Sequence, residues 1–170
     1  MADIDSLQQL IACENIRNCL ARYCRGVDRT DADLVRSAYW PDVDASQLDF
    51  RGDCEAFIAW SFPSVAKMDF MAHQIGNVLI DLDGDGADVQ TSFTSYRRVA
   101  ADDGLKGFLG GGRYLDRFER REDLWKIAKR LVVVDWSHEL GMAPPGLPVA
   151  GAVKRWPEDI SYSWFQESMS

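Results

Sequence analysis

The amino-acid sequence predicts a single α+β domain, in which helices come first and an antiparallel sheet follows. In the first third of the chain, apolar residues recur at spacings of three and four, as in amphipathic helices. From residue 70 onward, long runs rich in strand-forming residues are separated by short turns that contain glycine and aspartate. Helices followed by a run of strands are typical of α+β domains. With 170 residues, one domain spanning 1–170 is expected, with its core at about 5–138 and a tail at 139–170.

The helical part is expected to hold three helices and one short strand. Gly26 weakens the first helix near its end. The second helix should end before Trp40 and Pro41, because the residue before a proline is pushed out of the helical region. Pro63 should interrupt or kink the third helix. The expected elements are helices at 4–26, 31–39 and 54–68 and a strand at 46–52.

Four strands should form the rest of the sheet as a meander. The turn "DGDG" at 83–86 is of a kind that hairpins use, and "ADDG" at 101–104 is a second turn. Three consecutive glycines at 110–112 indicate a bulge or a sharp bend. The segment "DLDGDGAD" lacks the glutamate that completes a calcium loop, so it is interpreted as a hairpin turn. The expected strands are 70–82, 87–100, 106–121 and 125–138.

The tail begins with a loop rich in proline and glycine and continues with "RWPEDISYSWF" at 155–165. This segment holds too many aromatic residues for a disordered tail. We expect it to fold back on the sheet, over a pocket mouth or a neighbouring subunit.

The net charge of −8 argues against nucleic acid and anionic membranes as partners, because an acidic surface repels phosphate groups. The N-terminus lacks a signal-peptide pattern, and no apolar run approaches about 18 residues. A cytoplasmic protein that acts on a small molecule is therefore expected. The four cysteines form no C-x-x-C pair, so we expect no metal site and interpret them as small buried residues in a reducing compartment.

Four segments in order, "ARYCRGVDRTDADLV", "MAHQIGN", "GGGRYLDRFERREDLWKIAKR" and "VVVDWS", resemble the nuclear transport factor 2-like superfamily, and within it the polyketide-cyclase (SnoaL-like) branch. The resemblance covers about residues 5–138. Scytalone dehydratase, bile-acid dehydratase and hexachlorocyclohexane dehydrochlorinase belong to this superfamily. The resemblance implies a cone-shaped, cystatin-like barrel, in which a strongly curved, mostly antiparallel sheet wraps around N-terminal helices and leaves a deep apolar pocket. It also implies a homo-oligomer, with a trimer expected, and lyase chemistry that uses no metal and no organic cofactor.

The resemblance also implies the catalytic residues. Asp28 in "GVDRTD" and His73 in "MAHQIGN" match the Asp–His dyad of the lyases in this superfamily. Tyr23 matches a tyrosine five positions before that aspartate, and Arg130 matches an arginine on the last strand. Tyr96 lies near the position of a second carboxylate in the bile-acid dehydratase, so a role for a second acid is not carried over. The expected substrate-binding residues are Tyr96, Trp40, Tyr114 and Trp136.

These residue types suit an elimination reaction. A histidine has an ordinary pKa of about 6.5 and exchanges protons readily at neutral pH. A carboxylate on one ring nitrogen fixes the tautomer and stabilises the imidazolium, so His73 is assigned as base or acid and Asp28 as its orienting partner. Tyr23 would donate a proton to a leaving oxygen, and Arg130 would stabilise negative charge. We expect Tyr23 and Asp28 to face one cavity because the first helix frays beyond Gly26.

The last strand leaves one question open. Arg130 alternates with Val132, Val134 and Trp136 and so shares their face, where an unpaired guanidinium would be costly. Arg130 must therefore meet a carboxylate or await a ligand. Ile127 has the opposite parity, so it can face the same side as Arg130 only if a bulge intervenes.

Each candidate also has a purely structural interpretation. His73 can be a hydrogen-bonded core histidine, and Asp28 can be a helix cap. Tyr23 can be a core residue with its hydroxyl at the rim, and Arg130 can belong to a structural salt bridge. His138, the second of two histidines, is interpreted as structural or superficial.

Three functions are compatible with these residues. The first is a cofactor-independent lyase in the catabolism of bulky aromatic or apolar hydroxylated molecules. It would act by dehydration or a related C–O or C–C cleavage, such as loss of formaldehyde from an aryl-propanoid. The second is an isomerase or cyclase on a steroid- or polyketide-like ring system. The third is a non-catalytic module that binds apolar ligands, since one fold hosts several functions. The enzymatic functions require His73 within hydrogen-bond distance of Asp28 in an open pocket.

Overall fold

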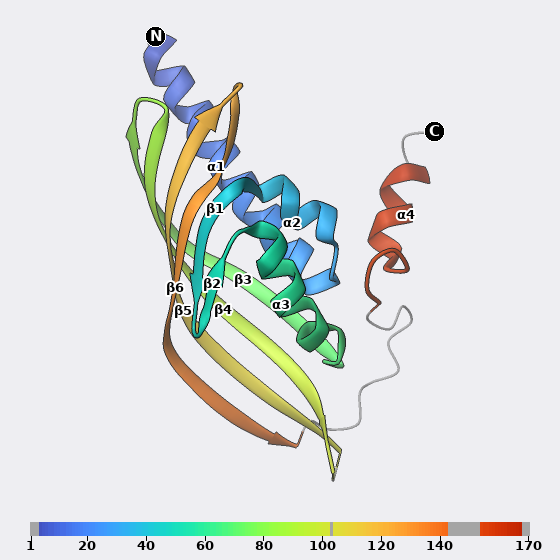
Figure 1. Ribbon diagram of the computed structural model, residues 1–170. Helices are drawn as coiled ribbons and strands as arrows, with labels where there is room; N and C mark the ends of the chain where they lie inside the picture. Colours follow the sequence, from blue (N-terminus) through green and yellow to red (C-terminus); the bar gives the residue numbers. More distant parts are fainter. Residues whose placement is uncertain (1–3, 103, 143–153, 168–170) are drawn as a thin grey trace.

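The computed structural model describes residues 4–102, 104–142 and 154–167 (Figure 1). Helices precede the long strands along the chain, which confirms the α+β class. The helices are α1 (Ile4–Arg29), α2 (Ala32–Ala38), α3 (Cys54–Ala66) and α4 (Ile160–Glu167). The strands are β1 (Tyr39–Gln47), β2 (Phe50–Gly52), β3 (Phe70–Asp83), β4 (Gly86–Ala101), β5 (Gly104–Arg121) and β6 (Leu124–Met142).

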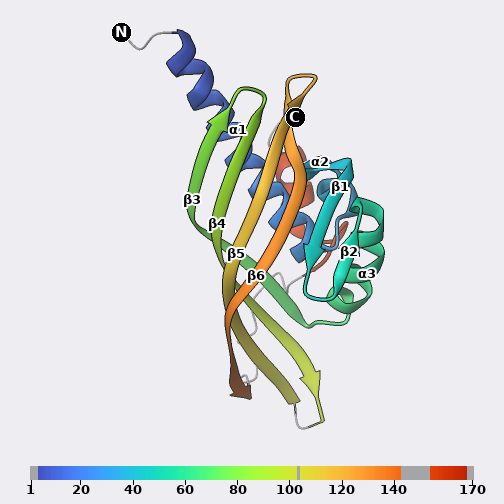
Figure 2. The ribbon, with the colours of Figure 1, turned by 60° about the vertical axis from the view of Figure 1, so that its left-hand side comes forward.

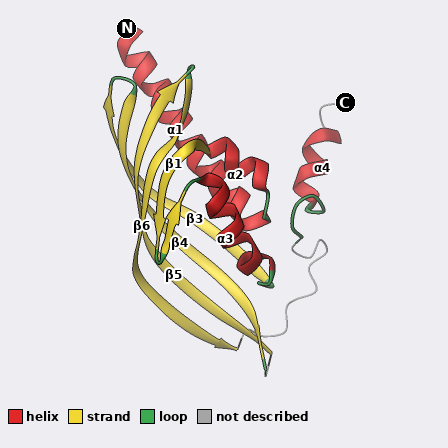
Figure 3. Cartoon of the chain, in the orientation of Figure 1, coloured by secondary structure: helices red, strands yellow, loops and turns green. Residues whose placement is uncertain are grey.

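The described strands form one sheet in the order β2-β1-β6-β5-β4-β3, which Figure 2 shows from edge to edge. Neighbouring strands are antiparallel except β1 and β6, which run parallel. The sheet is strongly curved and is not closed, so the expected barrel is an open one. Helices α1, α2 and α3 lie on its concave side (Figure 3). The apolar core fills the space between these helices and the sheet.

A first irregularity in the β5–β6 ladder lets residues of opposite parity face the core together. The register of the two strands shifts between Arg117 and Phe118. As a result Ile127 and Arg130 are both buried, at 0% and 1% exposure, although their positions differ by an odd number. The bulge that the parity of these residues required is therefore present.

A second shift falls between Gly111 and Gly112 and confirms the expected bulge in the glycine run. A Cβ atom on Gly112 would lie 2.0 Å from the carbonyl oxygen of Val133, so a glycine is needed for the strands to approach this closely. The shift also reverses the alternation of side chains on β6. Trp136 therefore points to the opposite face from Val134, and the predicted common face of these two residues is wrong.

The single strand expected at 46–52 is instead divided by a turn at 48–49 between β1 and β2, and β1 begins earlier than predicted, at Tyr39. The chain leaves α2 at Ala38 and pairs at once with β6 through Tyr39. Pro41 lies in a register shift between Tyr39 and Asp44, where the ladder needs no backbone N–H donor at this position. Pairing with a distant strand thus overrides the local signal of Trp40-Pro41.

Gly26 does not end the first helix, which continues to Arg29. A Cβ atom on Gly26 would lie 2.7 Å from Cγ2 of Val35 and 2.9 Å from its backbone nitrogen. The absence of a side chain therefore allows α1 and α2 to pack closely. The helix ends at Thr30, which has a positive φ of 53°.

The described part of the tail packs against the ends of α1 and α3. Arg29 forms an ion pair with Asp159 at 3.0 Å, and Nη2 of Arg25 donates to Oγ of Ser161 at 3.0 Å. Figure 1 shows α4 on the helical side of the molecule. The predicted loop at 141–151 lies largely outside the described residues. Among the described helices, none combines the length and the apolar character that a membrane span requires.

Candidate active site

Asp28 and His73 are joined by two hydrogen bonds. Nδ1 of His73 lies 2.6 Å from Oδ1 of Asp28, and the backbone N–H of His73 donates to Oδ2 at 2.9 Å. The side chains are 9% exposed for His73 and 11% exposed for Asp28. Because both carboxylate oxygens are engaged, the orientation of the imidazole is fixed relative to α1. With Nδ1 on the carboxylate, Nε2 is the ring nitrogen left for a ligand.

The dyad forms where the last turn of α1 packs against the start of β3. The helix stays regular through Arg29, so Tyr23 and Asp28, five residues apart, point roughly 140° from each other. The expected fraying of the helix is therefore wrong. Tyr23 faces the cavity, whereas Asp28 lies behind His73, and the imidazole connects the carboxylate to the cavity. Asp31 caps α2 by accepting from the backbone N–H of Leu34, so the structure assigns the cap to Asp31.

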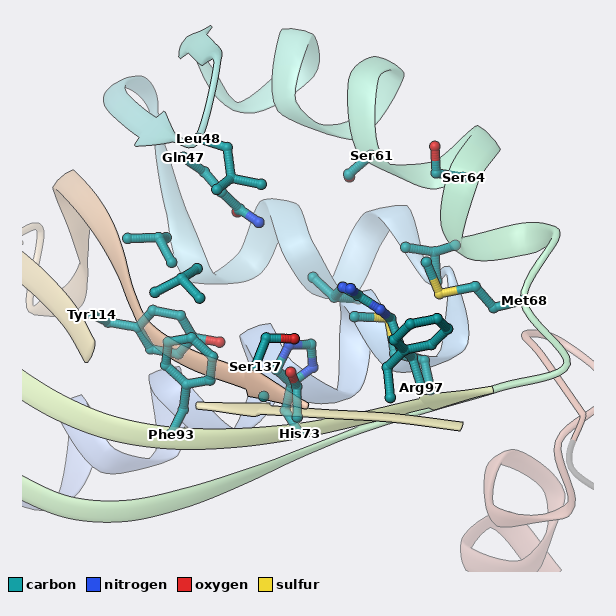
Figure 4. Close-up of a pocket in the computed structure, with 18 of the residues that line it drawn as sticks. Gln47, Leu48, Ser61, Ser64, Met68, His73, Phe93, Arg97, Tyr114 and Ser137 are labelled. Carbon is teal, nitrogen blue, oxygen red and sulfur yellow. The ribbon is translucent and has the colours of Figure 1, made fainter. Parts of the chain in front are cut away.

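A cavity of about 420 Å³ lies between the concave side of the sheet and α3 (Figure 4). Its wall is mostly apolar and aromatic, and its polar side chains include His73, Arg97 and several serines. None of the described residues that line it is an aspartate or a glutamate. The larger apolar groups on the wall include Phe57, Trp60, Met71, Phe93, Phe108 and Tyr114.

Beneath the cavity, a buried ion pair supports two of its tyrosines. Nε and Nη2 of Arg130 donate to the two carboxylate oxygens of Asp116 at 2.7 and 2.5 Å, and both side chains are almost completely buried. Cζ of Arg130 lies 4.2 Å from the ring centre of Tyr23 and 4.3 Å from that of Tyr114. Burial raises the pKa of Tyr23, and the positive charge of Arg130 opposes that rise only in part. Tyr23 is therefore a phenol at neutral pH and can donate a hydrogen bond.

The sequence matches the family model of the SnoaL-like domain over residues 8–131. The protein belongs to the SnoaL-like family. This confirms the resemblance found in the sequence, and no curated protein matches the chain.

Solved structures agree with the family in fold. Hexachlorocyclohexane dehydrochlorinase LinA-type3 from Novosphingobium barchaimii LL02 has a TM-score of 0.71 at 18% identity, covering 82% of this chain and 99% of that one. A candidate scytalone dehydratase from Novosphingobium aromaticivorans has a TM-score of 0.69 at 14% identity, covering 88% and 96%. An NTF2-like protein with a cystatin-like fold from the same species has a TM-score of 0.62 at 21% identity, covering 79% and 92%. At these identities the likeness shows the cystatin-like fold alone.

Within this SnoaL-like domain, Tyr23, His73 and Tyr114 line the cavity, but Arg130 does not. The open question about Arg130 is answered by Asp116, which occupies two of its donors. Nη1 of Arg130 has no hydrogen-bond partner among the described residues and is buried. Arg130 lies against the rings of Tyr23 and Tyr114 and is not itself on the cavity wall, which corrects its assignment as an anchor that touches substrate.

Trp40, Tyr96 and Trp136 do not line this cavity, which corrects their assignment to substrate binding. Nε1 of Trp40 donates to the backbone oxygen of Glu119 at 3.1 Å, so the indole ring of Trp40 is held against the end of β5. Tyr96 has the opposite parity from the cavity-lining residues of β4 and packs on Phe70, with 5.7 Å between ring centres. Trp136 is turned away by the bulge described above.

Sequence analysis missed several residues of the cavity wall. Phe93, Ser95 and Arg97 alternate along β4 and share one face, a pattern that was readable but could not be oriented without knowing the register. The register pairs Ser95 with His73, which places this face toward the cavity. Ser137 follows the bulge in β6, so its face could not be predicted from alternation.

Proposed function

We propose that this SnoaL-like protein is a cofactor-independent lyase that acts on a bulky aromatic or apolar hydroxylated small molecule. It would remove water or cleave a related C–O or C–C bond. The observation that carries the proposal is the 2.6 Å contact between Asp28 and His73 beside a cavity of about 420 Å³. A module that only binds apolar ligands has no need for a buried acid–base pair at its cavity wall. The names of two similar structures, a dehydrochlorinase and a candidate dehydratase, also favour an elimination.

In a dehydration, Nε2 of His73 removes a proton from the carbon next to the one that bears the hydroxyl group. The C–H electron pair forms the new C=C bond, the C–O bond breaks, and its electron pair leaves with the oxygen. Asp28 stabilises the imidazolium and holds it in place. The imidazolium then gives its proton to the leaving oxygen, which releases water and restores neutral His73. General acid–base catalysis of this kind contributes roughly 10²- to 10⁴-fold in rate.

Tyr23 assists by donating a hydrogen bond to the leaving oxygen. Its raised pKa keeps the proton on the phenol, and the guanidinium of Arg130 against its ring increases the acidity of the hydroxyl relative to burial alone. Arg130 is thus a positioning residue, held in place by Asp116, and makes no contact with substrate.

The proposal is tested by incubating the protein with aryl-propanoid diols and polycyclic alcohols and identifying the products by mass spectrometry. We expect products that have lost water or formaldehyde. His73→Ala should lower turnover roughly 10²- to 10⁴-fold with an unchanged circular dichroism spectrum. The matched control is His138→Ala, which removes the other histidine, at an exposed position, and should leave turnover unchanged. A product with the mass of its substrate would indicate an isomerase, and full activity of His73→Ala would disprove the proposed chemistry.

A further inference from the structure

One arginine at the cavity differs from its neighbours in the sheet. The described strands β3 to β6 contain seven arginines, and six of them form ion pairs with carboxylates. The seventh, Arg97, forms no ion pair or hydrogen bond with a residue that the structure describes, and its Cζ lies 5.3 Å from the ring centre of Phe108. The chain has a net charge of −8 and carboxylates are plentiful, yet no carboxylate of a described residue pairs with Arg97.

Arg97 lies on the same face of the sheet as the dyad histidine. His73 pairs directly with Ser95 across β3 and β4, and Arg97 is two residues further along β4. Diagonal neighbours of this kind lie about 7 to 8 Å apart at the level of the Cβ atoms. All three side chains line the cavity, and Figure 4 shows Arg97 and His73 projecting into it from adjacent strands. A ligand that reaches His73 therefore has Arg97 within the length of one aromatic ring and its substituent.

His73 and Arg97 begin a strip of polar side chains on this face of the sheet, and two hydroxyl groups extend it. The register aligns His73 with Ser95, Ser95 with Gly110, and Gly110 with Ser137 over four strands. Ser95 and Ser137 both line the cavity, and Gly110 contributes no side chain between them. The strip therefore offers hydrogen bonds beside Arg97 without filling the space above it.

The positive charge of Arg97 has no acidic counterpart among the described residues of the cavity wall. Among the described lining residues there is no aspartate or glutamate, and the carboxylate of Asp28 is engaged by His73 outside the cavity wall. An anionic ligand would supply the missing partner. A guanidinium group presents parallel N–H donors that match the two oxygens of a carboxylate.

We infer that the cavity binds an aromatic carboxylate, whose carboxylate group lies on Arg97 and the serine hydroxyls while its ring packs on Phe93 and Trp60. This inference rests on the proposed function for the position of the reacting atoms at His73, and it narrows the substrate to a hydroxylated aromatic acid. Because Arg97 is exposed to solvent, the gain from its charge should be at the lower end for charged hydrogen bonds, about tenfold in Kd.

The test compares acids with their neutral methyl esters by isothermal titration calorimetry. Benzoate, 4-hydroxycinnamate and biphenyl-4-carboxylate form a series of increasing length. We expect at least one acid to bind about tenfold more tightly than its ester. Arg97→Gln should abolish this preference. The matched control is Arg113→Gln, which removes one charge from the same sheet at an ion pair with Asp135 and should keep the preference.

The result is independent of catalysis, so failure of the inference and failure of the proposed function can be told apart. His73→Asn disables the proposed chemistry and should leave the preference for the acid intact. If no acid in the series binds more tightly than its ester, including the case in which none binds, the inference is wrong. It is also wrong if Arg97→Gln retains the preference. If the protein then still converts a neutral alcohol, and this turnover depends on His73, the lyase proposal holds although the inference about carboxylates fails.

Discussion

Arg155 donates a hydrogen bond to the backbone carbonyl of Asp28, a residue 127 positions earlier in the chain. Its Nη2 also donates to the carbonyl oxygens of Val65 at 3.0 Å and Met68 at 2.9 Å. Val65 and Met68 line the cavity, and Asp28 is hydrogen-bonded to His73. One side chain of the tail therefore ties the end of α1 to the end of α3, and connects the dyad to the cavity wall.

Removing this connection should affect both stability and turnover. Arg155→Ala leaves three carbonyl groups without their charged donor, so we expect the free energy of unfolding to fall by about 1.5 to 3 kcal/mol in urea denaturation. The turnover number should fall more than KM changes, because Asp28 is less firmly placed. Lys154→Ala, at the exposed neighbouring residue, is the control and should change neither quantity. Unchanged stability of Arg155→Ala would mean that the tail does not hold the site together.

The carboxylate of Asp28 should be needed for chemistry and much less for folding. In Asp28→Asn the amide oxygen can still accept from the backbone, but the imidazole loses its ionic partner and its fixed tautomer. We expect turnover to fall roughly 10²- to 10⁴-fold at similar KM. Asp31→Asn removes a charge three residues away and keeps a good helix cap, so it should behave as the wild type. Equal losses in the two variants would point to a general electrostatic effect.

The buried pair of Arg130 and Asp116 should be costly to break from one side only. Asp116→Leu or Arg130→Met leaves a buried charged group uncompensated, and we expect each to lower the free energy of unfolding by about 3 to 5 kcal/mol. The double variant Arg130→Met with Asp116→Leu should recover much of that loss, because no charge remains buried. Chemical denaturation of the wild type, the two single variants and the double variant measures the four free energies of unfolding. Additive losses in the double variant would show that the two residues do not act as a pair.

A side chain at position 26 should disturb the contact between α1 and α2. Gly26→Ala places a methyl group 2.7 Å from Val35, so we expect a loss of about 1 to 3 kcal/mol in the free energy of unfolding, despite the better helix propensity of alanine. In a Val35→Ala background the same substitution should cost less, because the nearest atom is gone. A double-mutant cycle measures this difference. Stabilisation by Gly26→Ala would mean that helix propensity, and not packing, decides at this position.

Buried thiols should make the protein less stable at alkaline pH. Burial raises the pKa of Cys19 to about 11 and that of Cys24 to about 12. The unfolded chain gives up these protons near the ordinary value of about 9, so stability is fully present below that pH and is lost as the pH rises toward 11 to 12. Each thiol should contribute a slope of up to about 1.4 kcal/mol per pH unit in this window. Urea denaturation in reducing buffer from about pH 8 to pH 10.5 measures the slope, and Cys24→Ala should reduce it. A flat profile would contradict the prediction.

Much of the fold was predictable because the signals are local. The spacing of apolar residues in α1, the turns that bound β3 and β4, and the glycine run in β5 each report on a few neighbouring residues. The first part of strand β1 was missed because it forms by pairing with β6, about 85 residues away, against the local preference set by Pro41.

By itself, the sequence determined the α+β class and the SnoaL-like family, and it singled out Asp28 and His73 as candidates, since residue type and order are sufficient for these. The tertiary structure alone decided which side chains share the cavity. Each bulge between β5 and β6 reverses the alternation of side chains, so parity counted along the chain misplaced Trp136 and could not place Ser137. The partner of Arg130, and the lack of one for Arg97 among the described residues, likewise depend on contacts between distant strands, which no local pattern encodes.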